Sequence, residues 1–143
     1  MAAGKLGLIA GGGALPLAIA ARCEAEGRPV FVVRLTGFAD AHLVRYPGVE
    51  AGMAEIGKVL AALKKAGCTA VCFAGTVNRP DFKRLKPDLK GATVLPGIIA
   101  AATKGDDALL RKILSVFEAE GYAIEGADDI LGGETLPGGA LGR

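Results

Sequence analysis

The sequence has no tryptophan, a single serine and a single histidine, and aromatic residues make up only 5% of its 143 residues. Ser115 falls within an amphipathic helical pattern, which argues against a serine triad. His42 has no partner at metal-ligand spacing, and we expect it in a surface loop. Because 51% of the residues are nevertheless hydrophobic, the core must be built mainly from aliphatic side chains.

Cysteines are few, and long apolar runs are absent. Cys23, Cys68 and Cys72 are an odd number without C-x-x-C spacing, which argues against a disulfide framework and against a zinc site. Each falls in a predicted helix or strand, so we expect buried, reduced and unreactive thiols, typical of a cytoplasmic protein. No run approaches the roughly 18 apolar residues of a membrane span. The net charge of +2 argues against a general nucleic-acid-binding protein.

Glycine is abundant, with 22 residues, and it marks the ends of the predicted elements. Apolar runs typical of buried strands alternate with helical periodicities that end at glycines. This alternation predicts an α/β fold, a Rossmann-like three-layer domain with a mostly parallel sheet. The expected strands are 5–10, 29–33, 69–74 and the apolar stretch 122–124. The expected helices are 17–26, 55–66, 106–120 and a weaker stretch at 95–103, whereas 36–53 and 78–91 are expected to be irregular.

The first expected strand ends in a glycine turn, Gly11-Gly12-Gly13-Ala14-Leu15-Pro16. A strand, a glycine turn and a helix together place backbone N–H groups and a helix N-terminus against a phosphate. The turn departs from the dinucleotide fingerprint G-x-G-x-x-G because Pro16 occupies the third glycine position. The second strand ends near Arg34 instead of the acidic residue that binds an NAD ribose. An NAD site is therefore disfavoured, whereas an NADP site and a turn without a ligand both stay open.

A second polar turn, Gly75-Thr76-Val77-Asn78-Arg79-Pro80, follows the strand expected at 69–74. Open parallel sheets bind ligands beyond such strand ends. Thr76 and Asn78 offer hydrogen bonds, and Arg79 offers a bidentate fork to a phosphate; a polar turn without a ligand is the alternative. The stretch 79–90 carries five basic and two acidic side chains, a local charge of +3. That charge fits anionic lipid head groups, a pyrophosphate or a solvated loop.

Two pairs of carboxylates, Asp106-Asp107 and Asp128-Asp129, are of the type that holds a magnesium ion. Aspartate at a helix start also caps backbone N–H groups and complements the helix dipole. We expect capping for at least one member of the first pair, and a turn or cap for the second. The metal ligands therefore stay unassigned.

Four blocks span nearly the whole chain: Ile9–Pro16, Phe73–Pro80, Gly105–Leu110 and Gly126–Leu131. In residues and order they resemble the LpxI-type UDP-2,3-diacylglucosamine pyrophosphatases. The resemblance implies a phosphoric anhydride hydrolase of lipid A biosynthesis, in which water attacks the α-phosphorus and UDP-2,3-diacylglucosamine yields UMP and 2,3-diacylglucosamine 1-phosphate. It implies Mg²⁺ as the cofactor and the cytoplasm as the location, with peripheral contact with the inner membrane.

The resemblance covers only the N-terminal domain of a two-domain family. It implies a Rossmann-like domain over 1–131 and a Gly/Pro-rich linker or tail over 132–143. The C-terminal catalytic domain, with most metal ligands, is absent from this chain, so we expect the chain alone to be inactive and assign no catalytic residue. The expected substrate-binding residues are Gly12, Gly13, Leu15, Thr76, Asn78, Arg79 and Lys104. An NADP-binding oxidoreductase domain and a non-catalytic nucleotide-binding domain are the alternatives, and the oligomeric state is open, a homodimer included.

Overall fold

Parallel strands form the middle layer of the computed structural model, which describes residues 4–77 and 82–132. Within those residues the sheet has five strands in the order β3-β2-β1-β4-β5, and each pair of neighbours is parallel. The α/β, Rossmann-like prediction is therefore confirmed. The strands are β1 (Leu6–Ala10), β2 (Val30–Leu35), β3 (Gly48–Ala51), β4 (Ala70–Ala74) and β5 (Ala123–Ile124).

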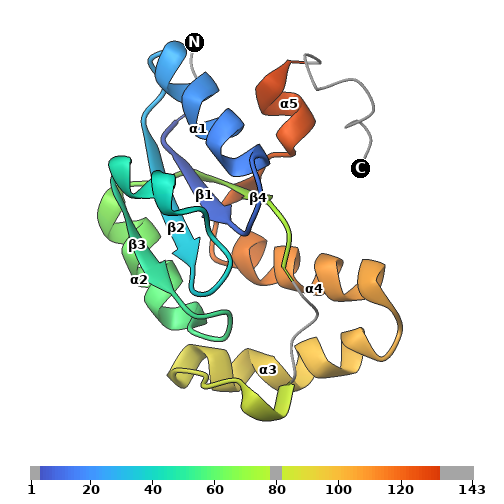
Figure 1. Ribbon diagram of the computed structural model, residues 1–143. Coiled ribbons are helices and arrows are strands. Elements are labelled where there is room, and N and C mark those ends of the chain that lie inside the picture. The colour runs from blue at the N-terminus through green and yellow to red at the C-terminus, as the bar shows by residue number, and fades with distance from the viewer. Residues whose placement is uncertain (1–3, 78–81, 133–143) are drawn as a thin grey trace.

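Helices cover both faces of this sheet (Figure 1). On one face, α1, α5 and the 3₁₀ helix η1 pack on alternate strand residues such as Leu8 and Val32. On the other face, α2 and α4 pack on the strand residues that alternate with these, such as Ile9 and Val71. Because successive strand residues point to opposite faces, one sheet supplies both halves of the aliphatic core. The helices are α1 (Leu15–Ala25), α2 (Ile56–Ala66), α3 (Leu89–Ala102), α4 (Asp106–Ala119) and α5 (Ala127–Leu131), with 3₁₀ helices η1 (Ala41–Arg45) and η2 (Phe82–Arg84).

Segment 36–53 is not irregular throughout, because it contains η1 and the edge strand β3. Only Ala51 of β3 is buried, so the strand has little hydrophobic pattern of its own. It forms because its backbone pairs with β2, with Val33 opposite Val49. Tertiary pairing rather than local pattern therefore determines this strand.

Helix α3 begins at Leu89, six residues before the expected start, and continues through Pro96. The side chain of Asp88 caps it by accepting a hydrogen bond from the N–H of Gly91 at 2.8 Å. Gly91 also packs closely on the segment just before α2, since an added Cβ would overlap the carbonyl oxygen of Ala54. The cap and the close contact hold the first turns of α3 in place although Pro96 cannot donate a helical hydrogen bond.

Candidate functional site

The strand order reverses between β1 and β4. From β1 the chain adds β2 and β3 on one side of the sheet, and it then adds β4 and β5 on the other side. Open parallel sheets form a ligand-binding crevice at this position, outside the carboxyl ends of the strands. Here the crevice is bordered by the β1–α1 loop (residues 11–14) and the loop that follows β4 (residues 75–77). The two predicted glycine turns therefore lie side by side.

Three backbone hydrogen bonds join these two loops. The N–H of Gly11 donates to the carbonyl of Ala74 at 2.8 Å, and the N–H of Gly12 donates to the carbonyl of Thr76 at 2.8 Å. Thr76 returns a bond to the carbonyl of Gly12 at 3.0 Å. Two of the glycine N–H groups are thus engaged by the protein itself, so a ligand must use groups farther along the loop.

Those groups lie at Gly13 and at the start of α1. None of the described residues accepts a hydrogen bond from the N–H of Gly13 or Leu15, and Ala14 provides no side-chain cap to α1. Gly13 has φ +86°, which other residues rarely adopt, and an added Cβ would meet nothing within 4 Å. An open surface with unpaired N–H groups at the positive end of a helix suits an anion.

The close approach of the loops depends on glycine at position 75. Gly75 has φ +99°, and a Cβ there would lie 2.7 Å from the carbonyl carbon of Gly11. Two apolar side chains border the loops, Leu15 with 40% and Val77 with 44% of its surface exposed. The site therefore combines backbone donors with apolar edges.

The structure gathers four of the seven predicted binding residues at these loops. Gly12 and Gly13 lie on one loop, Leu15 is the first residue of the helix that follows it, and Thr76 lies on the other loop. Lys104 lies elsewhere, with an exposed side chain in the turn between α3 and α4. Asn78 and Arg79 lie outside the described residues. Substrate binding by all seven stays a prediction.

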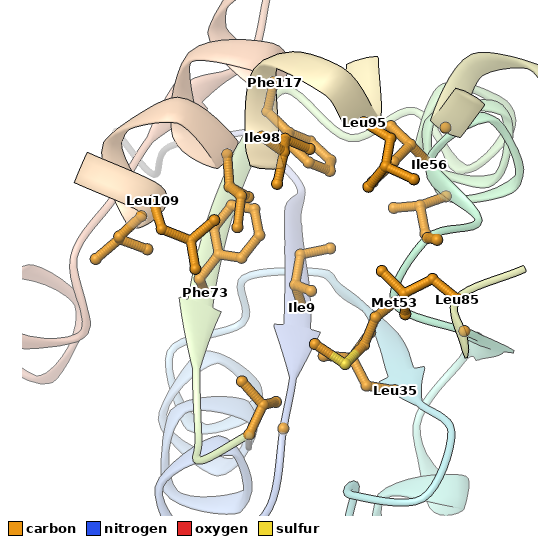
Figure 2. Close-up of a pocket in the computed structure, with 18 of the residues that line it drawn as sticks. Ile9, Leu35, Met53, Ile56, Phe73, Leu85, Leu95, Ile98, Leu109 and Phe117 are labelled. Carbon is orange, nitrogen blue, oxygen red and sulfur yellow. The ribbon is translucent and has the colours of Figure 1, made fainter. Parts of the chain in front are cut away.

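A cavity of about 510 Å³ extends from these loops across the face of the sheet that α2, α3 and α4 cover. Gly11, Gly75 and Val77 are among the residues that line it. Figure 2 shows the cavity side chains, which come from β1, β2, β4, α2, α3 and α4, from the loop after β3 and from the residue after η2. The sequence offered no signal for this cavity because its lining comes from segments far apart in the chain.

The similarity to known proteins identifies the family of this chain. Residues 5–133 match the family model of the LpxI N-terminal domain. The chain belongs to the LpxI N-terminal domain family. It is also 58% identical over 139 residues to the UDP-2,3-diacylglucosamine pyrophosphatase LpxI of Caulobacter vibrioides. That match covers 97% of this chain and 50% of the relative, so the chain spans about half the length of the relative.

Membership of the LpxI N-terminal domain family favours the hydrolase interpretation over the NADP-binding alternative. β2 ends with Arg34 and Leu35, and the hydroxyl of the next residue, Thr36, donates to Glu50 of the edge strand β3 at 3.0 Å. None of the helices in the described residues has the length and hydropathy needed to cross a bilayer.

One carboxylate of each acidic pair in this LpxI-type domain contacts a neighbouring group. α4 begins after Gly105 without a side-chain cap, so the capping expected of Asp106 or Asp107 is wrong, although both lie in its first turn, where they complement the helix dipole. Asp107 forms an i,i+4 pair with Arg111 in the first turn of α4, and Asp129 accepts a hydrogen bond from the N–H of Gly126 at 3.2 Å. Across residues 4–77 and 82–132, no three His, Cys, Asp or Glu side chains are grouped closely enough to hold a metal ion. The described residues therefore offer no preformed three-ligand site, whereas magnesium can also be held by one or two carboxylates together with substrate phosphates.

The three cysteines of this LpxI-type domain are buried and the histidine is exposed, as expected. However, Cys68 lies in the turn between α2 and β4 instead of a helix or strand, and His42 lies in the 3₁₀ helix η1 instead of a loop. All three cysteines are buried, and burial raises the pKa of the Cys72 thiol to about 12. His42 is exposed and forms hydrogen bonds through both its backbone N–H and its ring Nδ1 to Asp40. These bonds lower the pKa of the Asp40 carboxyl. None of these groups has the environment of a catalytic nucleophile.

One residue that the sequence analysis treated only as part of a charged loop connects two helices of the cavity wall. The carboxylate of Asp88 accepts the N–H of Gly57 at 3.0 Å and of Lys58 at 2.7 Å, both in α2, besides that of Gly91 in α3. The sequence signal that could have predicted this capping role is an aspartate that precedes a helical segment and has a glycine three residues after it.

Proposed function

We propose that this chain is the substrate-binding half of a hydrolase that cleaves UDP-2,3-diacylglucosamine to UMP and 2,3-diacylglucosamine 1-phosphate in lipid A biosynthesis. The observation that carries the proposal is the pair of glycine loops at the reversal of strand order. They present unpaired N–H groups in a chain that is 58% identical to a UDP-2,3-diacylglucosamine pyrophosphatase. The name of the relative indicates the substrate, and the N–H groups of the loops are suited to bind its phosphates.

In the proposed reaction, water attacks the α-phosphorus of the substrate. A new P–O bond forms to the water oxygen, and the bond from the α-phosphorus to the bridging oxygen breaks. The uridine part leaves as UMP, and the bridging oxygen leaves with the acylated glucosamine 1-phosphate. Negative charge therefore accumulates on phosphate oxygens, and stabilising that charge is a task for preorganised N–H donors.

This chain supplies the binding part of that task. The N–H groups of Gly13 and Leu15 donate to phosphate oxygens, and the N-terminal end of α1 adds the favourable field of the helix dipole. Each such interaction contributes about 0.3–1 kcal/mol at an exposed site. Anchoring the phosphates here fixes the position of the α-phosphorus for attack.

In this proposal, most of the metal ligands and the groups that activate water belong to a part of the enzyme outside this chain. Magnesium, the cofactor implied by the resemblance, would neutralise phosphate charge. Because the described residues contain no group of three side chains that could hold a metal ion, we assign most of its ligands to the half of the relative's length that this chain does not match. The chain alone should therefore bind the substrate weakly and release no UMP above a protein-free blank.

We also propose that the whole enzyme works in the cytoplasm at the surface of the inner membrane, because a diacylated substrate resides in lipid. Lys83, Arg84 and Lys86 are exposed on or beside η2 and suit anionic head groups. Sedimentation with anionic vesicles tests this contact, and binding should weaken as the salt concentration rises.

Two glycines provide a matched test of the binding site. Gly13 has φ +86° and Gly27 has φ +74°, and an added Cβ meets nothing within 4 Å at either position. Alanine at either position carries a similar backbone strain, about 1–2 kcal/mol. Only Gly13→Ala places a methyl group and a displaced N–H at the proposed phosphate site.

Isothermal titration of the chain with UDP-2,3-diacylglucosamine should therefore show a Kd for Gly13→Ala that is weaker by about two- to fivefold. The Gly27→Ala variant should bind like the unmodified chain. Equal affinities in all three proteins would contradict the assignment of the phosphates to this loop.

A further inference from the structure

Leu89, the first residue of α3, exposes a large apolar side chain to solvent. Its exposed fraction is 89%, the highest among the large hydrophobic residues that the structure describes, and Val44 follows with 67%. A single exposed hydrophobic residue is ordinary on a protein surface. Leu89, however, lies in the stretch 79–90, which carries five basic and two acidic side chains.

The segment before Leu89 directs its apolar residues inward and its basic residues outward. Phe82 and Leu85, three residues apart as in a 3₁₀ turn, line the cavity that α3 covers. The basic side chains between and after them are exposed, namely Lys83, Arg84 and Lys86. The solvent-facing surface of residues 82–89 therefore combines one large apolar side chain with three cationic ones.

The position of Leu89 is fixed by the residue before it. The carboxylate of Asp88 accepts hydrogen bonds from the N–H groups of Gly57 and Lys58 in α2 and of Gly91 in α3, at 2.7–3.0 Å. Because the start of α3 is thus attached to α2, little backbone entropy is lost when the side chain of Leu89 meets a partner. Figure 1 shows α3 at the end of the molecule opposite α1 and α5.

Resting on the proposed function and its membrane contact, we propose that Leu89 inserts into the bilayer as an apolar anchor, while Lys83, Arg84 and Lys86 bind anionic lipid head groups around it. The charge of the segment favours a membrane over an apolar protein surface, which would desolvate the cationic side chains without compensating anions. An anionic bilayer offers hydrocarbon to the leucine and negative charge to its neighbours.

The two kinds of contact respond differently to salt. A basic side chain near an anionic membrane surface strengthens binding about fivefold, and this contribution weakens as the salt concentration rises. Insertion of hydrocarbon is not screened in this way. The part of the membrane binding that persists at high salt should therefore depend on Leu89.

The absence of tryptophan from the chain allows a direct test of insertion. Leu89→Trp introduces a single tryptophan at the anchor, and Val44→Trp is the matched control. Val44 is also exposed, but it lies on η1, which packs on the opposite face of the sheet from α3. On titration with vesicles of phosphatidylglycerol and phosphatidylcholine, without substrate, the emission of Leu89→Trp should shift to shorter wavelength. Lipids brominated on their acyl chains should quench it, whereas the emission of Val44→Trp should not change.

The affinity for the same vesicles provides a second readout. Leu89→Ala removes three carbons, and a fully buried methylene strengthens binding about fourfold. For a partly inserted side chain we expect vesicle binding to weaken by about three- to tenfold, with the difference maintained at high salt. Val44→Ala should bind vesicles like the unmodified chain.

The outcomes separate this inference from the proposed function. Vesicle binding without a shift in Leu89→Trp emission would overturn the insertion and leave the electrostatic contact in place, and so would equal affinities for Leu89→Ala and the unmodified chain. A shift that grows with protein concentration without vesicles would assign Leu89 to a contact between copies and overturn the anchor. A lack of vesicle binding by the unmodified chain would overturn both the anchor and the membrane contact. The phosphate site is independent of these results, because Gly13→Ala tests it without vesicles.

Discussion

Replacing Asp88 with alanine should destabilise the domain by removing an acceptor shared by two helices. Its carboxylate accepts three backbone N–H groups at 2.7–3.0 Å, two from the start of α2 and one from the start of α3. Losing one N-terminal cap costs about 0.5–2 kcal/mol. Because two helix starts lose their acceptor, and part of the site is exposed to water, we expect a loss of about 1–3 kcal/mol.

Urea unfolding followed by circular dichroism measures this loss. In a separate thermal unfolding experiment, the midpoint temperature should fall by roughly 2–4 °C for each kcal/mol. Asp40→Ala is the control, because Asp40 caps the short, exposed η1 through the N–H of His42. Asp40→Ala should therefore cost less than Asp88→Ala. Equal losses for the two variants, or a loss below about 0.5 kcal/mol for Asp88→Ala, would refute the shared-cap account.

The pH dependence of stability provides a second check on Asp88. Partial burial raises the pKa of its carboxyl, but the hydrogen bonds from Gly91, Gly57 and Lys58 outweigh that effect and the pKa is lowered. A lowered pKa in the folded state means that the stabilisation is fully present above the ordinary value near 4. It is lost as the pH falls through the lower folded value, so the unmodified chain should lose more stability than Asp88→Ala between pH 6 and 3.

Further predictions concern the ion pair, the thiols and α3. Arg28 donates two 2.8 Å hydrogen bonds to Glu125, so a double-mutant cycle should give a coupling of about 1–3 kcal/mol, and additive losses would argue against it. The buried Cys72 thiol, with its pKa raised to about 12, should resist a thiol reagent until denaturant is added, as should the other two cysteines; rapid labelling of the native chain would contradict their burial. Gly91→Ala should lower the unfolding midpoint more than Gly27→Ala, because its Cβ overlaps the carbonyl of Ala54 whereas a Cβ at Gly27 meets open space.

The elements with strong local patterns were predictable from the sequence. β1 and β4 are continuous apolar runs, and α2 and α4 repeat their apolar residues at helical spacing. The glycine turns at the ends of β1 and β4 were predictable as well, and parallel strands bring their carboxyl ends to one edge of the sheet. That these two strands are neighbours was shown only by the structure.

Features that depend on distant contacts were not predictable. β3 needs the backbone of β2, and the early start of α3 needs Asp88 and the contact between Gly91 and Ala54. The engagement of the Gly12 N–H by Thr76 could not be inferred from the glycine pattern, which gave its position but not its hydrogen-bond partner. The cavity depends on how α3 and α4 pack over the sheet, which composition and periodicity do not specify.

An amide NMR titration of the chain with UDP-2,3-diacylglucosamine tests the central claim most directly. Phosphates held at the glycine loops should shift the N–H resonances of Gly13, Ala14 and Leu15 the most. The amides of Gly11 and Gly12, which already donate to the carbonyls of Ala74 and Thr76, should shift less. Saturable changes centred on Gly13 would support the account, whereas saturable changes that leave Gly13, Ala14 and Leu15 unmoved would contradict it.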